Sequence, residues 1–569
     1  MRLTDAIEKQ TCALTTSIDA KVDVQGYPES MPHRAPPKLT GDISELEKKL
    51  SSDGQVLYVG TPVYEQALDI GNLLYRFISP NIVVKALTIG DVQETVKFAR
   101  RNNIRLTVKN GGHSYAGYCL NEGGIVLDMR EMKAVSLNEP GMTATIQGGA
   151  IWKEAYAKLR NNHNGHIIIG GQCPSVGVSG FTLGGGLSPF SRSYGLGIDN
   201  LLEMTVVTAE GEVVKLSAED PNEKVRELFW AVRGGGGGNF AITVEMKSRI
   251  HKLRDQKNFQ VVCGALSWNL PQDRAKFNKA MDAFNNLECP DELTVDAIWH
   301  FAHDGQLKGE MTVIYNGTMD DCKKALAPVL DPAHGPTANG LKSMHWCEWM
   351  IVEEGFDKKD KVYHHHVSFI FADEAITPEV TNEINALMEQ FAEFKHQGGL
   401  CDAHILWDHV GGATARVASK NTAYFWRDGH YVTTFKIKWA LPEMEQSMLD
   451  FARHVTDRLA RFAIQGKAAY LNYIDSTVEH WQESYYGDNY ARLRKIKTDW
   501  DPKNFFRFKQ SIEPLDVVSK PRKAGDTLQE WEKYQLWAPK LLWQANTAEE
   551  ICITNDKLRR EICGLEVTP

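Results

Sequence analysis

Two residues that can form covalent bonds to an organic cofactor stand in glycine-rich surroundings. His113 directly follows Gly111 and Gly112, and Cys173 lies inside the stretch GGQCP at 170–174. Imidazole and thiolate are side-chain nucleophiles that can attach to a conjugated organic cofactor. A single histidine, however, is more often a structural residue, and a single cysteine is more often a small core residue. On their own, the two residues leave both interpretations open.

Glycine is concentrated in three places, at 111–112, 170–186 and 234–238. Runs of glycine allow positive φ angles and close backbone approach, and their amides can form concave anion sites. None of the three fits a known nucleotide loop well: GGG at 184–186 lacks the third glycine of the dinucleotide spacing, and GxxxxGK[ST] does not occur. Flexible linkers are the alternative. Because the runs lie between expected strands and helices, we interpret them as a ligand cradle.

The composition is that of a large globular protein. The 569 residues suggest three or four structural units, 43% of the residues are apolar, and the formal net charge is -9. No basic block stands out, so no nucleic-acid partner is predicted. No run of about 18 apolar residues occurs, so no membrane-spanning helix is expected. Asp5, Glu8 and Lys9 stand where a secretory signal needs apolar residues, which predicts a cytoplasmic protein.

Metal sites are not indicated. The ten cysteines are scattered without CxxC spacing, so neither a zinc site nor a disulfide scaffold is expected. His364, His365 and His366 form a short histidine tract. Successive side chains of a strand point to opposite faces, so we expect these histidines to be solvated or packed in a core rather than to bind a metal.

The elements that must position the glycine runs form an α+β region after Pro80. Strands are predicted at 82–84, 104–108, 124–128, 143–147, 204–208 and 213–216, the last two joined by a hairpin turn at 209–212. A helix is predicted to begin at Asp91, with Glu94 completing a capping box. Another helix, at 222–232, runs into the five glycines.

The second half of the chain has longer helices. Helices predicted at 273–286 and 378–394 alternate with strands such as 310–315 and 431–439, which indicates a second, antiparallel α+β domain. Residues 1–59 are polar and rich in proline, as is typical of an arm that lies on the surface. Residues 516–569 are charged and rich in tryptophan, and a helical extension is expected there.

Four ordered motifs resemble one enzyme family. KNGGHSYAG at 109–117 resembles the pyrophosphate loop of the FAD-linked oxidases of the vanillyl-alcohol-oxidase superfamily, and GQCPSVG at 171–177 resembles the second hallmark of its berberine-bridge-enzyme-like branch. RGGGGGNFAIT at 233–243 is similar to the third signature of that branch. YLNYID at 470–475, YYGDN at 485–489 and DPKNFF at 501–506 resemble its closing segment. The likeness covers about residues 58–515.

The resemblance implies an α+β fold with two large parts. A two-lobed FAD-binding domain of the PCMH type is expected at 60–252, and an antiparallel-sheet substrate domain is expected at 253–465. The berberine-bridge-like segment at 466–515 is expected to return to the FAD domain. The arm at 1–59 and the extension at 516–569 lie outside this scheme.

The resemblance also implies FAD that is covalently bound twice, through His113 to the 8α-methyl carbon and through Cys173 to C6. Two tethers would fix the ring while leaving one face open, and would raise its reduction potential. The expected cofactor-binding residues are Lys109, Asn110, Gly111, Gly112, His113, Ser114, Cys173, Val176, Gly177, Val178, Gly180, Gly185, Gly237, Gly238, Asn239, Phe240, Ile242 and Asn472.

Val176 occupies the position that gates oxygen in the family. A small or valine side chain there goes with oxidases, whereas leucine goes with dehydrogenases. Simple β-branched packing beside Cys173 is the alternative interpretation. We expect an oxygen-dependent oxidase that releases hydrogen peroxide.

Tyrosines are the expected catalytic residues. Tyr470 and Tyr473 match a YxNY pattern whose second tyrosine takes the hydroxyl proton in carbohydrate-oxidising relatives, and Tyr115 resembles a substrate-facing position. A tyrosine titrates near pH 10 and needs help to act as a base. Both YxNY tyrosines could instead be aromatics that pack on the flavin. Asp408 and His409 resemble polar pocket residues of relatives, or belong to a surface loop.

One position departs from the family. Relatives usually carry Gln or Glu where this chain has Thr434, and a threonine cannot be the base of the alkaloid ring-closing member. Together with the N-terminus, this favours an FAD-dependent oxidase that acts on a small specialised metabolite. The alternatives are a flavin-containing cyclase with no net redox chemistry and a carbohydrate or alcohol oxidase. A flavin-storing protein is disfavoured, because both attachment residues and Tyr473 are present.

Overall fold

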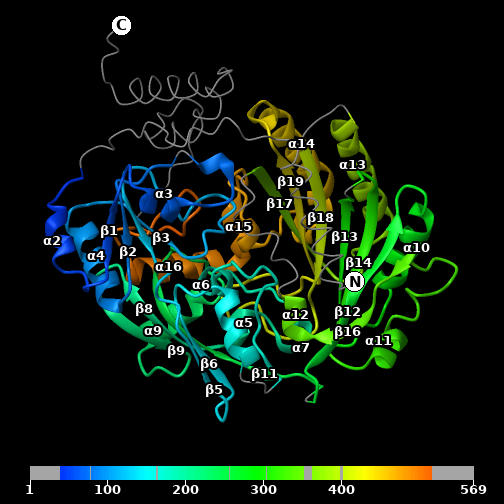
Figure 1. The fold of residues 1–569 in the computed structure, drawn as a ribbon, viewed down its shortest axis with the longest axis horizontal. Coiled ribbons are helices and arrows are strands. Elements are labelled where there is room, and N and C mark those ends of the chain that lie inside the picture. Colours follow the sequence, from blue (N-terminus) through cyan, green and yellow to red (C-terminus); the bar gives the residue numbers. More distant parts are fainter. Residues whose placement is uncertain are drawn as a thin grey trace, which may run out of the picture.

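The structure is a computed structural model that describes residues 39–76, 78–161, 165–255, 257–302, 304–350, 362–396 and 401–515. The predicted extension at 516–569 and most of the predicted arm at 1–59 therefore lie outside the described residues. Within these ranges the fold is α+β, with two lobes built from residues before 253 and one large antiparallel sheet (Figure 1).

The first lobe holds a four-stranded sheet in the order β1-β2-β4-β3. Strands β2, β4 and β3 are parallel, and β1 is antiparallel to β2. Residues 43–58 thus contribute structure to this lobe instead of forming only a surface arm. The elements are α2 (Ile43–Glu47), β1 (Gln55–Tyr58), α3 (Pro62–Leu68), η1 (Leu73–Tyr75), β2 (Ile82–Lys85), α4 (Ile89–Arg101), β3 (Leu106–Lys109) and β4 (Ile125–Asp128).

The helix predicted at Asp91 exists, but its predicted start is wrong. Helix α4 is capped by Thr88, whose hydroxyl accepts the Asp91 amide while the Asp91 carboxylate accepts the Thr88 amide. The capping box therefore pairs Thr88 with Asp91, one turn before the predicted pair. An N-cap threonine with an acid three residues later satisfies two amides that the first turn leaves unpaired.

The second lobe holds a five-stranded antiparallel sheet in the order β5-β6-β10-β8-β9, and the hairpin predicted at 209–212 joins β8 to β9. Its core includes aromatic and branched residues from α5, α9 and the sheet. The elements are β5 (Val135–Asn138), β6 (Thr143–Gln147), α5 (Trp152–Asn161), β7 (His166–Ile167), α6 (Val178–Leu183), α7 (Ser191–Tyr194), α8 (Gly197–Asn200), β8 (Leu201–Thr208), β9 (Val213–Ser217), α9 (Glu223–Val232), β10 (Ala241–Arg249) and β11 (His251–Lys252).

The third part is an eight-stranded antiparallel sheet in the order β15-β12-β14-β13-β18-β19-β17, with β16 paired to β12. One face carries an apolar core under α10, α13 and α14. The elements are β12 (Gln260–Asn269), α10 (Arg274–Asn285), β13 (Leu293–Phe301), β14 (Leu307–Tyr315), α11 (Met319–Ala325), β15 (Ala338–Asn339), β16 (Lys342–His345), α12 (Trp346–Met350), β17 (Tyr363–Phe371), α13 (Pro378–His396), β18 (Cys401–His409), β19 (Tyr431–Trp439), η3 (Pro442–Met444), α14 (Glu445–Leu459), η4 (Ala460–Phe462) and η5 (Ile464–Gly466).

The closing segment returns to the first two lobes. In Figure 1 the orange helices α15 and α16 lie among the blue and cyan elements, away from the green sheet that precedes them in sequence. Helix α16 packs on α9. The elements are η6 (Leu471–Tyr473), α15 (Trp481–Tyr486), η7 (Gly487–Asn489) and α16 (Tyr490–Trp500).

Strand β17 lies at the edge of the large sheet, and the first lobe and the closing segment cover that edge. Asn72 forms a parallel bridge to Val362, and its side chain bonds to the backbone of His364. Further along, the Ile370 amide donates to the Ala468 carbonyl. An uncovered edge would leave backbone groups unpaired, so these contacts also join the two domains.

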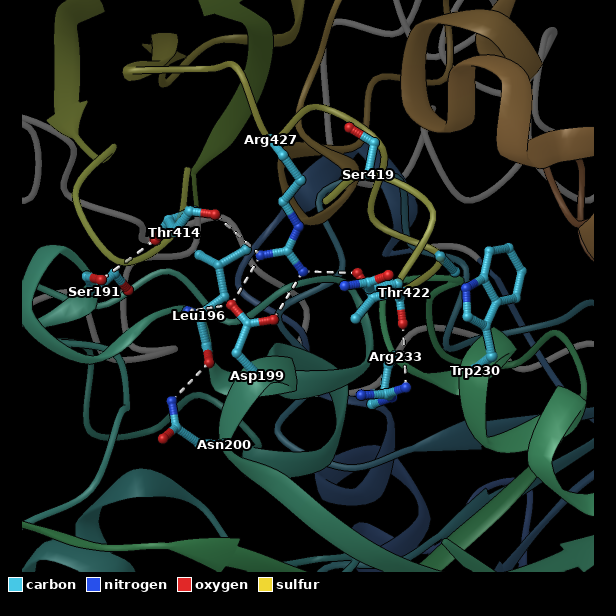
Figure 2. A network of polar contacts seen from close by, with 12 residues as sticks. Ser191, Leu196, Asp199, Asn200, Trp230, Arg233, Thr414, Ser419, Thr422 and Arg427 are labelled. Carbon is cyan, nitrogen blue, oxygen red and sulfur yellow. Dashed lines mark hydrogen bonds and ion pairs between the residues drawn. The ribbon is translucent and has the colours of Figure 1, made fainter. Parts of the chain in front are cut away.

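A buried ion pair strengthens the same junction (Figure 2). Arg427, in the loop between β18 and β19, contacts both oxygens of Asp199 in α8, each over 2.8 Å. The Arg427 guanidinium also donates to the Thr422 hydroxyl over 2.7 Å. Bidentate pairs of this kind fix orientation as well as distance, so α8 and the 410–430 loop are held in one arrangement.

Candidate active site

The glycine loop after β3 presents backbone amides. Gly112 has a φ of 76°, and the amides of Gly111 and Gly112 donate no hydrogen bond within the described ranges. A Cβ atom on Gly112 would lie 3.3 Å from the Nζ atom of buried Lys109. Successive amides above a cation form an anion-binding concavity. The loop therefore fits the pyrophosphate of a dinucleotide.

Asn110 ties this loop to the second glycine region. Its amide group donates to the Gly148 carbonyl over 2.7 Å and lies 2.9 Å from the Ser179 hydroxyl. A Cβ atom on Gly111 would collide with the Gly177 amide nitrogen, so the two loops meet backbone to backbone. The Val178 amide is already bonded to the Ala150 carbonyl. Asn110, Gly177 and Val178 thus shape the cradle.

The two expected attachment residues lie next to each other. His113 Nε2 is 2.9 Å from the Ser175 hydroxyl, and Cys173 Sγ is 3.5 Å from the same oxygen. All three side chains are half-buried. One hydroxyl therefore links the imidazole and the thiol at one wall of the site. The sequence analysis did not single out Ser175, although it lies within the second motif.

The cradle has open space where a flat ligand would pass. A Cβ atom on Gly180 would meet no atom within 4 Å, and Cβ atoms on Gly237 and Gly238 would have their nearest neighbours at 3.6 and 3.5 Å. Asn239 is buried, and its side chain holds the glycine run by accepting the Ile512 amide and donating to the Gly235 carbonyl. Because these positions carry no side chain, they leave open space for a cofactor.

Two expected cofactor residues pack elsewhere. Phe240 is 2% exposed and belongs to the second-lobe core, and Ile242 is 1% exposed and belongs to the first-lobe core. Ile242 lies in β10 and Phe240 directly precedes that strand, and each packs into a different one of the two cores. Their role is to support the cradle from behind.

On the side of the large sheet, Tyr473 meets Asp408. The Tyr473 hydroxyl donates to Asp408 Oδ2 over 2.9 Å, and both side chains are half-buried. Desolvation and then the charge of Asp408 hold the pKa of Tyr473 well above its ordinary value. A carboxylate disfavours a neighbouring phenolate, so a proton that reaches Tyr473 can be passed to Asp408.

Tyr470, in contrast, sits in a socket of N–H donors. Its hydroxyl oxygen accepts the amides of Gly186 and Leu187 over 3.1 and 3.2 Å and the Asn472 side-chain amide over 3.1 Å. Burial raises its pKa to about 12 despite these bonds. A Cβ atom on Gly184 would collide with Asn472, so the absence of a side chain at Gly184 makes space for the Asn472 side chain. The three bonds fix the Tyr470 hydroxyl and lower its pKa against the larger effect of burial, and the catalytic role of Tyr470 stays a prediction.

Tyr115 connects the glycine loop to the large sheet. Its ring stacks on His366 with 3.5 Å between centroids, and lies 6.0 Å from the Tyr473 ring. His366 Nδ1 is 3.4 Å from the Thr434 hydroxyl, and its Nε2 is 3.1 Å from His364 Nδ1. Burial and then Lys436 hold the pKa of His366 well below its ordinary value, so the ring is neutral at pH 7.

His409 is not part of this cluster. It follows Asp408 in β18 and so points to the opposite face, where its Nε2 is 2.9 Å from Arg192 Nη1 and its ring stacks on Tyr431. The expected substrate role is therefore assigned to the wrong side of the strand. His366 was missed as a pocket residue, although the same alternation places it on the face shared with Thr434.

Known proteins share these motifs and this fold. Residues 80–217 match the family described as FAD binding domain, and residues 469–513 match the family described as berberine and berberine like. The chain is 30% identical over 473 residues to the uncharacterized FAD-linked oxidoreductase YvdP of Bacillus subtilis, which covers 81% of this chain and 98% of that protein. The chain belongs to the berberine-bridge-enzyme-like FAD-linked oxidoreductases.

Two further relatives agree with this assignment. The carbohydrate oxidase of Microdochium nivale is 27% identical over 491 residues, covering 83% of this chain and 95% of that protein. The solved structure of BBE-like 1 from Physcomitrella patens superposes with a TM-score of 0.72 at 25% identity, covering 84% of this chain and 100% of that one. The predicted α+β, two-domain PCMH-type fold is thus confirmed.

The berberine-bridge-like oxidoreductase binds FAD as its cofactor. The described ranges contain no group of three His, Cys, Asp or Glu side chains that could hold a metal ion. None of the helices in the described part of the chain is long and apolar enough to cross a membrane.

Proposed function

We propose that this FAD-linked oxidoreductase oxidises a hydroxyl-bearing carbon of a polar small molecule and uses oxygen as the electron acceptor. The observation that carries the proposal is the bond between Tyr473 and Asp408, because it supplies an acceptor for a hydroxyl proton. The carbohydrate oxidase among the relatives supports this substrate class. The narrower prediction of a specialised metabolite stays a prediction.

The proton moves in two coupled steps. The substrate hydroxyl gives its proton to the Tyr473 oxygen while Tyr473 gives its own proton to Asp408. Tyr473 stays neutral throughout, and Asp408 ends as a carboxylic acid. This route avoids a free phenolate, which the desolvated site and the adjacent carboxylate both disfavour. When bound, FAD supplies the hydride acceptor for the carbon and passes the electrons to oxygen.

Residues of three strands orient the substrate. Asp408 lies on β18, Thr434 on β19 and His366 on β17, with Tyr115 stacked over His366. A neutral imidazole can donate at one nitrogen and accept at the other, which suits hydroxyl groups. The polar face of the sheet therefore fits a hydroxylated ligand better than a purely apolar one.

We further propose that His113 and Cys173 are the two attachment points of FAD. Their shared contact with Ser175 supports this, because both nucleophiles lie at the same wall of the cradle. Val176, next in sequence, is half-buried and its carbonyl accepts the Trp152 amide. A valine there supports oxidase rather than dehydrogenase behaviour.

The test measures flavin bleaching under nitrogen and peroxide under air, with mono- and oligosaccharides, aryl alcohols and phenolic metabolites as substrates. Wild-type enzyme should bleach and form peroxide with at least one hydroxylated compound. Asp408→Asn should slow both signals about 10²–10³-fold, whereas Asp402→Asn, on the same strand but paired with Lys395, should keep the wild-type rates. Product formation without bleaching would instead indicate the cyclase alternative, and bleaching at the wild-type rate in Asp408→Asn would refute the proton route.

A further inference from the structure

The histidine tract of β17 divides between two neighbours. His364 and His366 contact Tyr115 at ring-centroid distances of 6.0 and 3.5 Å. His365 points the other way, toward the closing segment, as alternation in a strand requires. All three side chains thus make contacts at the junction between the large sheet and the FAD domain.

His365 forms a buried ion pair with Asp475. The His365 Nε2 atom lies 3.4 Å from Asp475 Oδ1, and the two side chains are 10% and 5% exposed. The same carboxylate oxygen accepts the Thr477 amide and hydroxyl, each over 2.7 Å. The histidine is thus one of three groups that hold a carboxylate with little access to water.

Asp475 is joined to Tyr473 by a short, fixed piece of backbone. Only Ile474 separates the two residues. The Asp475 amide donates to the Tyr485 hydroxyl over 2.9 Å, and the Asp475 carbonyl accepts the Gln510 side-chain amide over 2.9 Å. At the other end, the Tyr470 amide donates to the Ser368 hydroxyl over 3.2 Å. Strand β17 therefore contacts the 470–475 segment at both ends of that segment.

We propose that His365 is a positioning residue for Tyr473: its ion pair with Asp475 holds the 470–475 segment so that the Tyr473 hydroxyl stays against Asp408. The inference rests on the role given to Tyr473 under the proposed function. His365 is paired with Asp475, and it acts on Tyr473 through that residue.

The attraction between His365 and Asp475 is complete only between two pH limits, so the position of Tyr473 should depend on pH. The Asp475 charge raises the pKa of His365 against the opposing effect of burial, and His365 lowers the pKa of Asp475. The attraction is complete below pH 6.5 and is lost as pH rises through the raised pKa of His365. At the acid end it is complete above pH 3.8 and is lost as pH falls through the lowered pKa of Asp475.

Other titratable groups lie near the pair. His364 and His366 flank His365, and burial holds the pKa of both well below the ordinary value, so both are neutral at the upper pH limit, where His365 titrates. Three tyrosines face Asp475, and burial raises the pKa of each; they are Tyr75, Tyr118 and Tyr485. Lys436 and Lys438 stand on the neighbouring strand β19, opposite His366 and His364.

The first measurement needs no substrate. Amide hydrogen exchange of residues 470–475 is followed in the holoenzyme at pH 6 for wild type, His365→Gln, Asp475→Asn and the double variant. Exchange should rise about tenfold in each single variant, and no further in the double variant, since both remove one contact. Asp402→Asn, which breaks a buried ion pair elsewhere in the same sheet, should leave exchange in this segment unchanged.

The second measurement separates positioning from mere structure. His365→Gln and Asp475→Asn should lower kcat on an alcohol substrate about tenfold with KM within about twofold, because binding groups on the sheet stay in place. Wild-type kcat should fall above the pKa of His365, and that limb should vanish in His365→Gln. The flavin absorption spectrum confirms that each variant is folded and loaded.

The two measurements fail separately. Unchanged exchange in residues 470–475 would show that the His365–Asp475 pair does not hold this segment, and would overturn the proposal. Raised exchange with unchanged kcat and an unchanged pH profile would show that the pair is only structural and would overturn the positioning role. If wild-type enzyme oxidises no alcohol, the proposed function fails, and the exchange result alone then decides whether His365 holds the segment.

Discussion

Tyr473 donates a hydrogen bond to Asp408 over 2.9 Å, although the two residues are 65 positions apart in the sequence. Tyr470, three residues before Tyr473, accepts three N–H bonds instead. The Tyr473 hydroxyl thus faces a carboxylate that accepts its proton, whereas the Tyr470 oxygen faces N–H donors. Such contrast separates roles within one site: Tyr473 faces the group that can take its proton, whereas Tyr470 is fixed in place.

Asp408→Asn should remove the proton acceptor and leave the pocket intact. An asparagine keeps the shape and still accepts from Tyr473, but it cannot be protonated at neutral pH. We expect kcat with an alcohol substrate to fall about 10²–10³-fold, the range typical of lost general-base catalysis. Anaerobic flavin reduction in a stopped-flow instrument measures the step directly.

Tyr473→Phe should cost about as much as Asp408→Asn, and the double variant should cost no more than either. Residues that act as one unit are not additive in rate. Full additivity of the two losses in log kcat would show that the residues work independently, against the coupled route.

The proposed bonds from His113 and Cys173 to FAD predict whether the flavin stays with the protein after acid precipitation. In wild type and in each single variant, His113→Ala and Cys173→Ala, the flavin should stay with the precipitated protein, because one bond is enough to retain it. The double variant should release the flavin into the supernatant. Ser175→Ala, which removes the hydroxyl between the two residues, should keep both bonds but form them more slowly. Release of flavin from wild type would contradict covalent attachment.

Local pattern was enough to predict many elements of the fold. Strands at 143–147 and 431–439 were predicted with the bounds that β6 and β19 have, because alternation and turn residues mark their ends. His113 and Cys173 were singled out because both stand among glycines, which allow close backbone approach to a ligand. Their role as attachment points came from the family resemblance and stays a prediction. These signals lie within a few residues of the site they specify.

Contacts between distant segments were beyond the reach of local pattern. The stacking of His366 on Tyr115 depends on how β17 docks against the glycine loop, and that docking is set by the covered sheet edge. The wrong assignment of His409 had a simpler cause. Asp408 and His409 are neighbours in one strand, and alternation allows only one of them to face the pocket.

Two glycine substitutions should separate a structural glycine from a cofactor glycine. Gly184→Ala would force a Cβ atom into Asn472, so the enzyme should lose about 1–3 kcal/mol of stability, as overpacked sites do. Gly180→Ala meets no protein atom within 4 Å and lies in helix α6, so stability should hold or rise. FAD content should nevertheless fall in Gly180→Ala. Thermal unfolding and the flavin-to-protein absorbance ratio report the two effects, and unchanged FAD loading would remove Gly180 from the cradle.

Val176→Leu should slow the reaction with oxygen and spare the reaction with substrate. The reduced enzyme is mixed with oxygenated buffer, and reoxidation is followed at the flavin band. We expect the rate to fall at least about tenfold, since only the passage of oxygen to the site is narrowed. Equal rates for both enzymes would mean that Val176 is a packing residue.

Lys497 should determine whether the third glycine run can hold its cofactor. Its ammonium is 0% exposed, bonds to Asp501 and the Phe506 carbonyl over 2.7 Å each, and also donates to the Asn239 carbonyl. Lys497→Met would leave Asp501 buried without its cation, so we expect a loss of about 3–5 kcal/mol in the free energy of unfolding. FAD loading should fall with it, because Asn239 holds the glycine run. Lys495→Met, on the exposed side of the same helix, is the matched control.

The same lysine predicts a pH signature of stability. Burial lowers the pKa of Lys497 from 10.5 to about 8. Between these values the unfolded chain binds a proton that the folded chain has released, so the Lys497 contribution to the free energy of unfolding rises with pH over that range. Lys497→Met should lack this rise, and Lys495→Met should keep it. Denaturant unfolding from pH 7 to 10 measures the difference between the two variants, and parallel curves would show that Lys497 keeps its proton in the folded enzyme.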